Sequence, residues 1–237
     1  MSKVVLVSPH SCSITQGITD TAMAGVARIL SKYFPKGMRY RSFTQKAVNL
    51  KKTPQDYPAL TGSEHWRRKI RTLFRARDID GDGYLTKKDY EMNVHRVSSY
   101  MNLNENQAKD LMKWKMFVWE TLSRSTEASA DFHLPEDDFV SNMLAAYPII
   151  VETIVDVASC DFDTVDVDGD GFISPQEHKA CFYGFGIPLK HSTDVFKVLD
   201  TDSDGKISRE DFVQGFVDFF LSEDENSPHA CFFGPLI

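Results

Sequence analysis

The feature that most constrains this chain is a stretch of twelve residues, 166–177, which reads DVDGDGFISPQE. Gly171 holds its sixth place, where the chain must turn through backbone angles that only glycine adopts at low cost. A ring of six to eight hard oxygen ligands around such a turn suits calcium, so the stretch predicts a calcium-binding loop. The predicted ligands are Asp166, Asp168, Asp170, the Phe172 carbonyl, Ser174 through a water molecule, and Glu177.

The same pattern recurs in register at residues 78–89 and 200–211. One Asp-Gly-rich run is usually a solvated turn. Three copies, each between amphipathic helical stretches, indicate EF-hand loops and predict three calcium sites. The further predicted ligands are Asp78, Asp80, Asp82, the Tyr84 carbonyl, Thr86 and Asp89 in one copy, and Asp200, Asp202, Asp204, the Lys206 carbonyl, Ser208 and Asp211 in the other.

A fourth stretch, residues 127–138, has the length of such a loop without its chemistry. Its places 128–130 are Ala, Ser and Ala, and Phe132 stands where glycine is needed. We therefore predict a degenerate hand that binds no ion and is kept for packing.

Each intact loop also carries a helix-start signal, because its ninth and twelfth places form the S/T-x-x-D/E pattern of a capping box. The same residues would thus bind the ion and begin the exiting helix. The eighth places are apolar, and in paired hands they meet on a short two-stranded bridge. We therefore pair Leu85 with Leu134, and Ile173 with Ile207. The predicted fold class is all-α, with two pairs of EF-hands in a compact globule.

These pairings divide the chain into four segments. We expect a basic extension at 1–62, a first hand pair at 63–145 and a second, fully intact pair at 146–222. A tail at 223–237 is expected to pack on the core. The extension is acid-poor and hydroxyl-rich and has helical apolar spacing over residues 18–34, as in a mitochondrial transit peptide. The alternative is a disordered or loosely docked basic segment.

Charge separates the same two parts of the chain. Residues 1–63 hold nine basic and two acidic side chains, a net charge of +7, and residues 64–237 hold 18 and 32, a net charge of −14. The acidic body argues against nucleic acid as a partner and suits a protein that collects cations. No apolar run reaches about 18 residues, so no membrane span is expected. The four cysteines are scattered, which favours a reducing compartment. We expect a cytoplasmic monomer, with mitochondria as the alternative location.

The three loops differ at their twelfth place. Glu177 is long enough to bind with both oxygens, whereas Asp89 and Asp211 are one methylene shorter. A shorter ligand lowers the coordination number towards six and weakens selection against magnesium. The loop at Asp166 is therefore expected to be the most selective for calcium, and the loops at Asp78 and Asp200 to accept magnesium.

An order of hands with the first, third and fourth intact and the second degenerate resembles the sarcoplasmic calcium-binding protein superfamily. That superfamily includes calexcitins, coelenterazine-binding proteins and calcium-triggered photoproteins. The long gap between Asp78 and Glu127, the segment 183–188 (YGFGIP) and the segment 232–236 (FFGPL) fit it too. The resemblance covers 63–237 and implies paired hands around an apolar centre.

Photoproteins of this superfamily surround a luciferin with His, Trp and Tyr side chains. This chain offers Phe216, Phe220 and Phe233 instead, so light emission is not expected. A purely apolar ligand stays open, since one set of aromatic residues can either line a cavity or form a filled core plugged by the tail. The set is Trp114, Phe117, Phe182, Phe216, Phe219, Phe220, Phe232 and Phe233.

Three functions follow, and none is enzymatic, because the seven histidines form no local set with a nucleophile. The leading one is an intracellular calcium buffer with magnesium exchange. The second is a calcium sensor that binds a target protein. Sensors favour a Met-rich groove, but the last methionine is Met143, ahead of the second hand pair. The third is a calcium-dependent carrier of a small apolar ligand.

Overall fold

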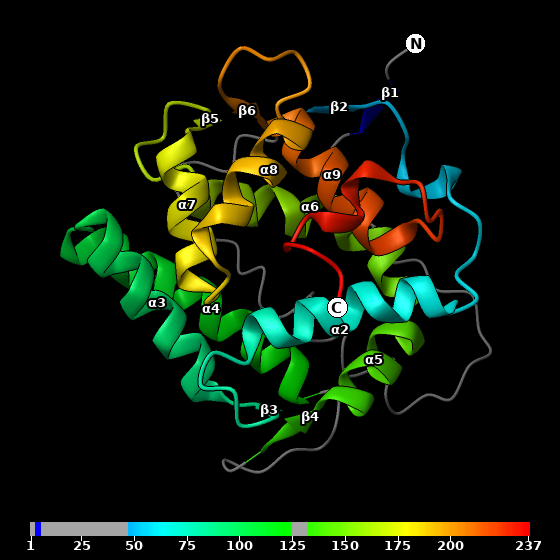
Figure 1. The fold of residues 1–237 in the computed structure, drawn as a ribbon, viewed down its shortest axis with the longest axis horizontal. Helices are drawn as coiled ribbons and strands as arrows, with labels where there is room; N and C mark the ends of the chain where they lie inside the picture. The colour runs from blue at the N-terminus through cyan, green and yellow to red at the C-terminus, as the bar shows by residue number, and fades with distance from the viewer. Residues whose placement is uncertain (1–2, 6–46, 125–131) are drawn as a thin grey trace.

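The computed structural model describes residues 3–5, 47–124 and 132–237. The helix predicted over residues 18–34 and places 127–131 of the degenerate loop lie outside these ranges. Within them the chain is mostly helical, which confirms the predicted all-α class (Figure 1). The helices are α2 (Glu64–Arg77), α3 (Lys87–Met101), α4 (Glu105–Arg124), α5 (Glu136–Ala145), α6 (Tyr147–Val165), α7 (Pro175–Gly184), α8 (Leu189–Leu199) and α9 (Arg209–Leu221). Two short 3-10 helices, η1 (Pro54–Asp56) and η2 (Pro228–Cys231), lie on either side.

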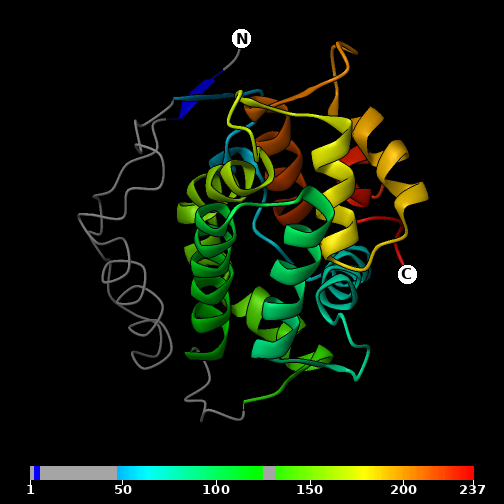
Figure 2. The same cartoon turned by 90° about the vertical axis from the view of Figure 1, so that its left-hand side faces the viewer.

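Two antiparallel bridges join the loops in the predicted register. Strand β3 (Tyr84–Leu85) pairs with β4 (Leu134–Pro135), so that Leu85 faces Leu134. Strand β5 (Phe172–Ile173) pairs with β6 (Ile207–Ser208), so that Ile173 faces Ile207. All four apolar partners are buried, which anchors each pair of loops to the core. Figures 1 and 2 show the two bridges at opposite ends of the molecule.

The hands enclose one continuous apolar core that runs through both pairs. Its fully buried rings come from α2, α5, α6 and α9, as Phe74, Phe139, Phe162 and Phe219 show. Helix α9 lies against α2, α6, α8 and the tail (Figure 2). The two predicted lobes are therefore halves of a single packed body.

Capping boxes start α3 and α7 as predicted, with Thr86 and Asp89 at one and Ser174 and Glu177 at the other. At α9 the Ser208 hydroxyl accepts from the Asp211 N–H at 3.2 Å. The return bond to Asp211 comes from the same hydroxyl, at 2.5 Å, instead of from the backbone. This makes the fourth hand start differently from the other two.

The N-terminal boundary differs from the prediction. Residues 47–62 were expected to belong to a basic extension with a linker, but strand β2 (Val48–Leu50) packs on α9 and pairs with β1 (Lys3–Val5). Val48 and Leu50 are fully buried and Tyr57 nearly so. The stretch is too short and polar around its three buried residues for periodicity to show it.

Hydrogen bonds fasten the same segment to α9. The Gln214 side chain accepts from the Lys52 N–H at 3.0 Å and donates to the Lys52 carbonyl at 3.2 Å. The Tyr57 hydroxyl donates to Asp218, whose other oxygen lies 2.6 Å from Nδ1 of His229 in the tail. One residue of α9 thus holds both the N-terminal segment and the C-terminal tail.

Among the described residues no single helix is long and apolar enough to cross a membrane. Helices α5 and α6 reach that length and composition only together, and they meet at an angle of 91°.

Candidate metal centre

The first loop, between α2 and α3, is closed by its own carboxylates. Asp78 accepts from the Gly81 N–H at 2.9 Å and from the Gly83 N–H at 3.0 Å. Asp89 accepts from the backbone N–H groups of Ile79 and Thr86, both at 2.9 Å. These bonds draw the two ends of the loop together and turn the remaining carboxylate lone pairs towards its centre.

The loop between α6 and α7 repeats this arrangement with a longer closing residue. Asp166 accepts from the Gly169 N–H at 2.8 Å and from the Gly171 N–H at 3.1 Å. Glu177 accepts from the N–H groups of Val167 and Ser174, both at 2.8 Å. Asp166 and Glu177 are buried, so this site is well sheltered from solvent.

The loop between α8 and α9 departs from the pattern. Asp200 accepts from the Gly205 N–H at 3.0 Å, as in the other loops. Its other oxygen accepts from the N–H of Asp204, at 3.1 Å, which is the fifth place of the loop instead of the fourth. Asp211 is held by two hydroxyls, Thr201 at 2.6 Å and Ser208 at 2.5 Å.

Each predicted loop brings three carboxylates together, with one oxygen from each lying within 4.8 Å of the others. Every group consists of carboxylates alone, a hard donor set that fits calcium or magnesium and not a soft metal. In two loops the closing twelfth residue belongs to the group, whereas in the last loop it does not. The groups are Asp78, Asp80 and Asp89; Asp166, Asp168 and Glu177; and Asp200, Asp202 and Asp204.

Two further predicted carboxylate ligands lie outside these close groups. The fifth-place carboxylates Asp82 and Asp170 accept from the N–H groups of Tyr84 and Phe172, at 2.9 and 2.8 Å. The carbonyls of Tyr84, Phe172 and Lys206 remain predicted ligands.

Burial perturbs the first-place carboxylates. Desolvation raises the pKa of Asp78 and of Asp166 above the ordinary aspartate value, although two glycine N–H groups act in the opposite direction at each. Neighbouring carboxylates add to the rise, because like charges disfavour ionisation. A divalent cation would remove this repulsion, so the loops are built to gain stability from one.

Two lysines lie against predicted ligands and were missed by the sequence reasoning. The Lys88 ammonium is 2.8 Å from the Asp80 carboxylate, and it lowers the pKa of Asp80. The Lys206 ammonium is 3.6 Å from the Asp170 carboxylate on the neighbouring loop and 4.8 Å from the Phe172 ring centroid. Both lysines are exposed, and a basic residue beside an acidic loop was the only sequence signal for them.

The aromatic set falls into a filled cluster, a separate stacked pair, and Phe182, which lies against His178. Phe216 lies 5.6 Å from Phe232, and Phe219 lies 5.0 Å from Phe233, measured between ring centroids. All four are buried. The tail rings therefore occupy the space beside α9, while Trp114 stacks on Phe117 in α4.

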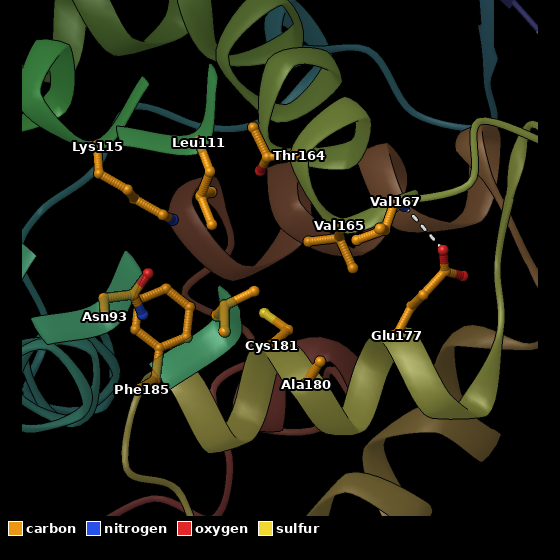
Figure 3. A pocket seen from close by; sticks show the side chains of 11 residues that line it. Asn93, Leu111, Lys115, Thr164, Val165, Val167, Glu177, Ala180, Cys181 and Phe185 are labelled. Atoms are coloured by element: carbon orange, nitrogen blue, oxygen red, sulfur yellow. Dashed lines mark hydrogen bonds between the residues drawn. The ribbon is translucent and has the colours of Figure 1, made fainter. Parts of the chain in front are cut away.

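A pocket lies elsewhere, between α3, α4, α6 and α7 (Figure 3). Glu177 borders one end, and Lys115 and Phe185 lie at the other. Asn93 is buried in its wall, and its Oδ1 has no hydrogen-bond partner among the described residues. The pocket thus sits at the junction of the two hand pairs and has room for one water molecule, about 20 Å³.

Comparison with known proteins agrees with these loops. The family models for an EF-hand domain pair match residues 156–217 and 68–90. The chain has an EF-hand fold. Its homologues are sarcoplasmic calcium-binding proteins and luciferin-binding proteins, as the resemblance in its sequence implied.

Three relatives illustrate the likeness. The luciferin-binding protein of Renilla reniformis is 27% identical over 193 residues, which is 76% of this chain and all of the relative. The sarcoplasmic calcium-binding protein of Perinereis vancaurica tetradentata is 29% identical over 177 residues, 74% of this chain and all of the relative. The calcium-loaded apo coelenterazine-binding protein of Renilla muelleri superposes with a TM-score of 0.63 at 24% identity, covering 73% of this chain and 99% of that one, and shows the shared fold.

Proposed function

We propose that this protein is a calcium buffer that binds three calcium ions while its two hand pairs stay closed. The observation that carries the proposal is the covered face of α9. A sensor opens its helices and presents an apolar groove to a target. Here the apolar face of α9 is packed against the chain's own tail, through Phe232 and Phe233.

Contacts between the two hand pairs also oppose opening. From α2, Trp66 Nε1 donates to the Phe220 carbonyl at 2.9 Å. Lys69 Nζ donates to the carbonyls of Phe219 and Ser222, at 2.5 and 2.6 Å. These carbonyls close the C-terminal end of α9, where a helix leaves acceptors unsatisfied and favours a positive charge. Opening the second hand pair would uncover them, at a cost of about 1–3 kcal/mol for each group left unpaired.

Magnesium exchange is part of the proposal. The loops that close with Asp89 and Asp211 favour lower coordination than the loop that closes with Glu177. They would hold magnesium at rest and exchange it when calcium rises.

A calcium-dependent carrier of a small apolar ligand is the second candidate. It is favoured by the likeness to the luciferin-binding protein over that relative's whole length. The pocket of Figure 3 does not support this candidate, because its free volume of about 20 Å³ is room for one water molecule. The filled aromatic cluster beside α9 speaks against a large cavity there.

A dye that fluoresces on exposed apolar surface tests the buffer against the sensor. We expect its signal to stay the same or fall when calcium is added to the metal-free protein, because the ion stabilises an already closed body. A calcium-dependent rise of severalfold would contradict the buffer proposal and favour the sensor. Calmodulin-like opening in a reference EF-hand sensor serves as the positive control.

A further inference from the structure

We infer that Thr201 and Ser203 make the loop at residues 200–211 the weakest of the three calcium sites, so that it fills last. The inference deepens the proposed function and rests on it. It follows from comparing three loops that share one pattern and differ at their second and fourth places.

The second place decides what holds the closing carboxylate. In the first and third hands it is apolar, Ile79 or Val167, and only its backbone N–H reaches the twelfth residue. In the last hand it is Thr201, whose hydroxyl donates to Asp211 at 2.6 Å. Both oxygens of the twelfth carboxylate accept hydrogen bonds in all three loops, but only in the last loop does a side-chain hydroxyl hold each of them.

The effect is visible in the carboxylate groups. Asp89 and Glu177 belong to the close groups of their loops, whereas the close group of the last loop is made without Asp211. To join the other carboxylates around a calcium ion, Asp211 must therefore leave the hydroxyl of Thr201. Since a hydrogen bond to a charged group is stronger than a neutral one, this exchange reduces the net gain from the twelfth ligand.

The residue at the fourth place sets the conformational cost of the turn inside each loop. Gly81 and Gly169 hold it in the other loops, both with φ of 72°. In the last loop it is Ser203, with φ of 60°. This is the left-handed region, which glycine enters freely and residues with a Cβ enter at a cost.

Exposure acts in the same direction. The twelfth-place Asp211 is half-buried, whereas Asp89 and Glu177 at the same place of the other two loops are buried. Water screens the attraction between an ion and exposed carboxylates more strongly. In the last loop, hydroxyls thus hold the twelfth carboxylate, Ser203 strains the turn, and water screens the attraction between the ion and Asp211 more strongly.

Site-resolved calcium titration of the full chain tests the inference. The backbone amides of Gly83, Gly171 and Gly205 report on the separate loops, because each donates to the first-place aspartate of its own loop. In the unaltered protein we expect the Gly205 resonance to shift at a calcium concentration about tenfold higher than that for Gly171. A Gly205 shift at the same or lower calcium would overturn the inference.

Two substitutions place the residues of the third hand, Val167 and Gly169, at the matching places of the fourth. Thr201→Val and Ser203→Gly should each lower the dissociation constant reported by Gly205 by about threefold to tenfold, with Gly83 and Gly171 unchanged. Thr201→Ser is the matched control, since it keeps the hydroxyl and should behave like the unaltered protein. If Thr201→Val and Ser203→Gly leave the Gly205 midpoint unchanged or raise it, the inference is wrong.

The melting temperature of the metal-free protein shows whether a variant is correctly folded. The metal-free Ser203→Gly variant should melt no lower than the unaltered protein, because glycine removes the strain at this place. A lower melting temperature would overturn the strain argument. If Gly171 and Gly83 also fail to respond to calcium, the proposed function fails; if they respond and the Gly205 variants do not tighten, only this inference fails.

Discussion

Among single residues, Lys69 joins the two hand pairs most directly. It is fully buried, and its ammonium caps the end of α9 while lying 5.4 Å from the Phe219 ring centroid. Burial lowers its pKa from the ordinary 10.5 to about 8, although Asp218 and Glu223 act against the shift. Its role depends on a helix from one hand pair meeting a helix end from the other.

Lys69→Met keeps the length of the side chain and removes its donors. The carbonyls of Phe219 and Ser222 would lose their partner, so we expect a loss of about 1–3 kcal/mol in the free energy of unfolding. Urea unfolding at pH 7 measures it. Lys190→Met, at an exposed position on α8, is the control and should change stability by less than about 0.5 kcal/mol. A loss no larger than that of the control would contradict the capping role.

The pH dependence of the same pair of proteins tests the lowered pKa. Between pH 8 and 10.5 the unfolded chain keeps the proton on Lys69 and the folded chain releases it. The free energy of unfolding therefore rises with pH in this window through Lys69. The stability advantage over Lys69→Met should grow from pH 8 to pH 10, and a constant difference would show that the folded state keeps the proton.

The loop carboxylates were predictable one by one because fixed spacing around a glycine turn is a local property. Lys69 was not, since the sequence shows only a basic residue on an amphipathic helix, and its partners lie 150 and 153 residues away. The sequence shows Thr201 at the second place of its loop. Its hold on the closing carboxylate could be recognised only from the hydrogen bond to Asp211 in the structure.

At the scale of elements, α3 and α7 form the main contact between the hand pairs. Both helices carry a twelfth-place carboxylate in their first turn, Asp89 in one and Glu177 in the other. They approach closely at Gly184, where an added Cβ would lie 2.4 Å from Cγ2 of Val97. Arg96 on α3 also donates to the Tyr183 carbonyl at 2.8 Å.

Gly184→Ala should therefore destabilise the protein. Val97 is β-branched and cannot move aside easily, so we expect a loss of about 1–3 kcal/mol in the free energy of unfolding. Adding Val97→Ala removes the clashing methyl and should recover part of that loss, which a double-mutant cycle would measure. If Val97→Ala made the loss from Gly184→Ala larger or left it unchanged, the close approach of the two helices would be contradicted.

Helices and bridges followed from the sequence where a loop fixed their ends, as at Leu85 with Leu134 and Ile173 with Ile207. The packing of α3 on α7 did not, because periodicity identifies an apolar face without naming its partner. The packing of residues 48–57 could not be predicted from the sequence for a related reason. Its buried residues are few, and their burial depends on α9, more than 150 residues away.

For the whole molecule, the hand pairs share one core and are tied together by α2, the N-terminal segment and the tail. Each tie ends on α9: Trp66 and Lys69 from α2, Tyr57 from the N-terminal segment and His229 from the tail. The acidic loops are also separated in space. The first loop carries one bridge and the last two loops share the other, and the two bridges lie at opposite ends of the body (Figure 1). Ions at the two ends would therefore repel each other little.

Native mass spectrometry of the gently purified full chain, in saturating calcium, tests whether the protein is a closed buffer with three calcium sites. It counts the bound ions and detects any retained organic molecule in one spectrum. We expect a chain that carries three calcium ions and no additional mass. Fewer than three ions at saturation, or an organic mass that is present without calcium and lost when calcium is added, would contradict this expectation.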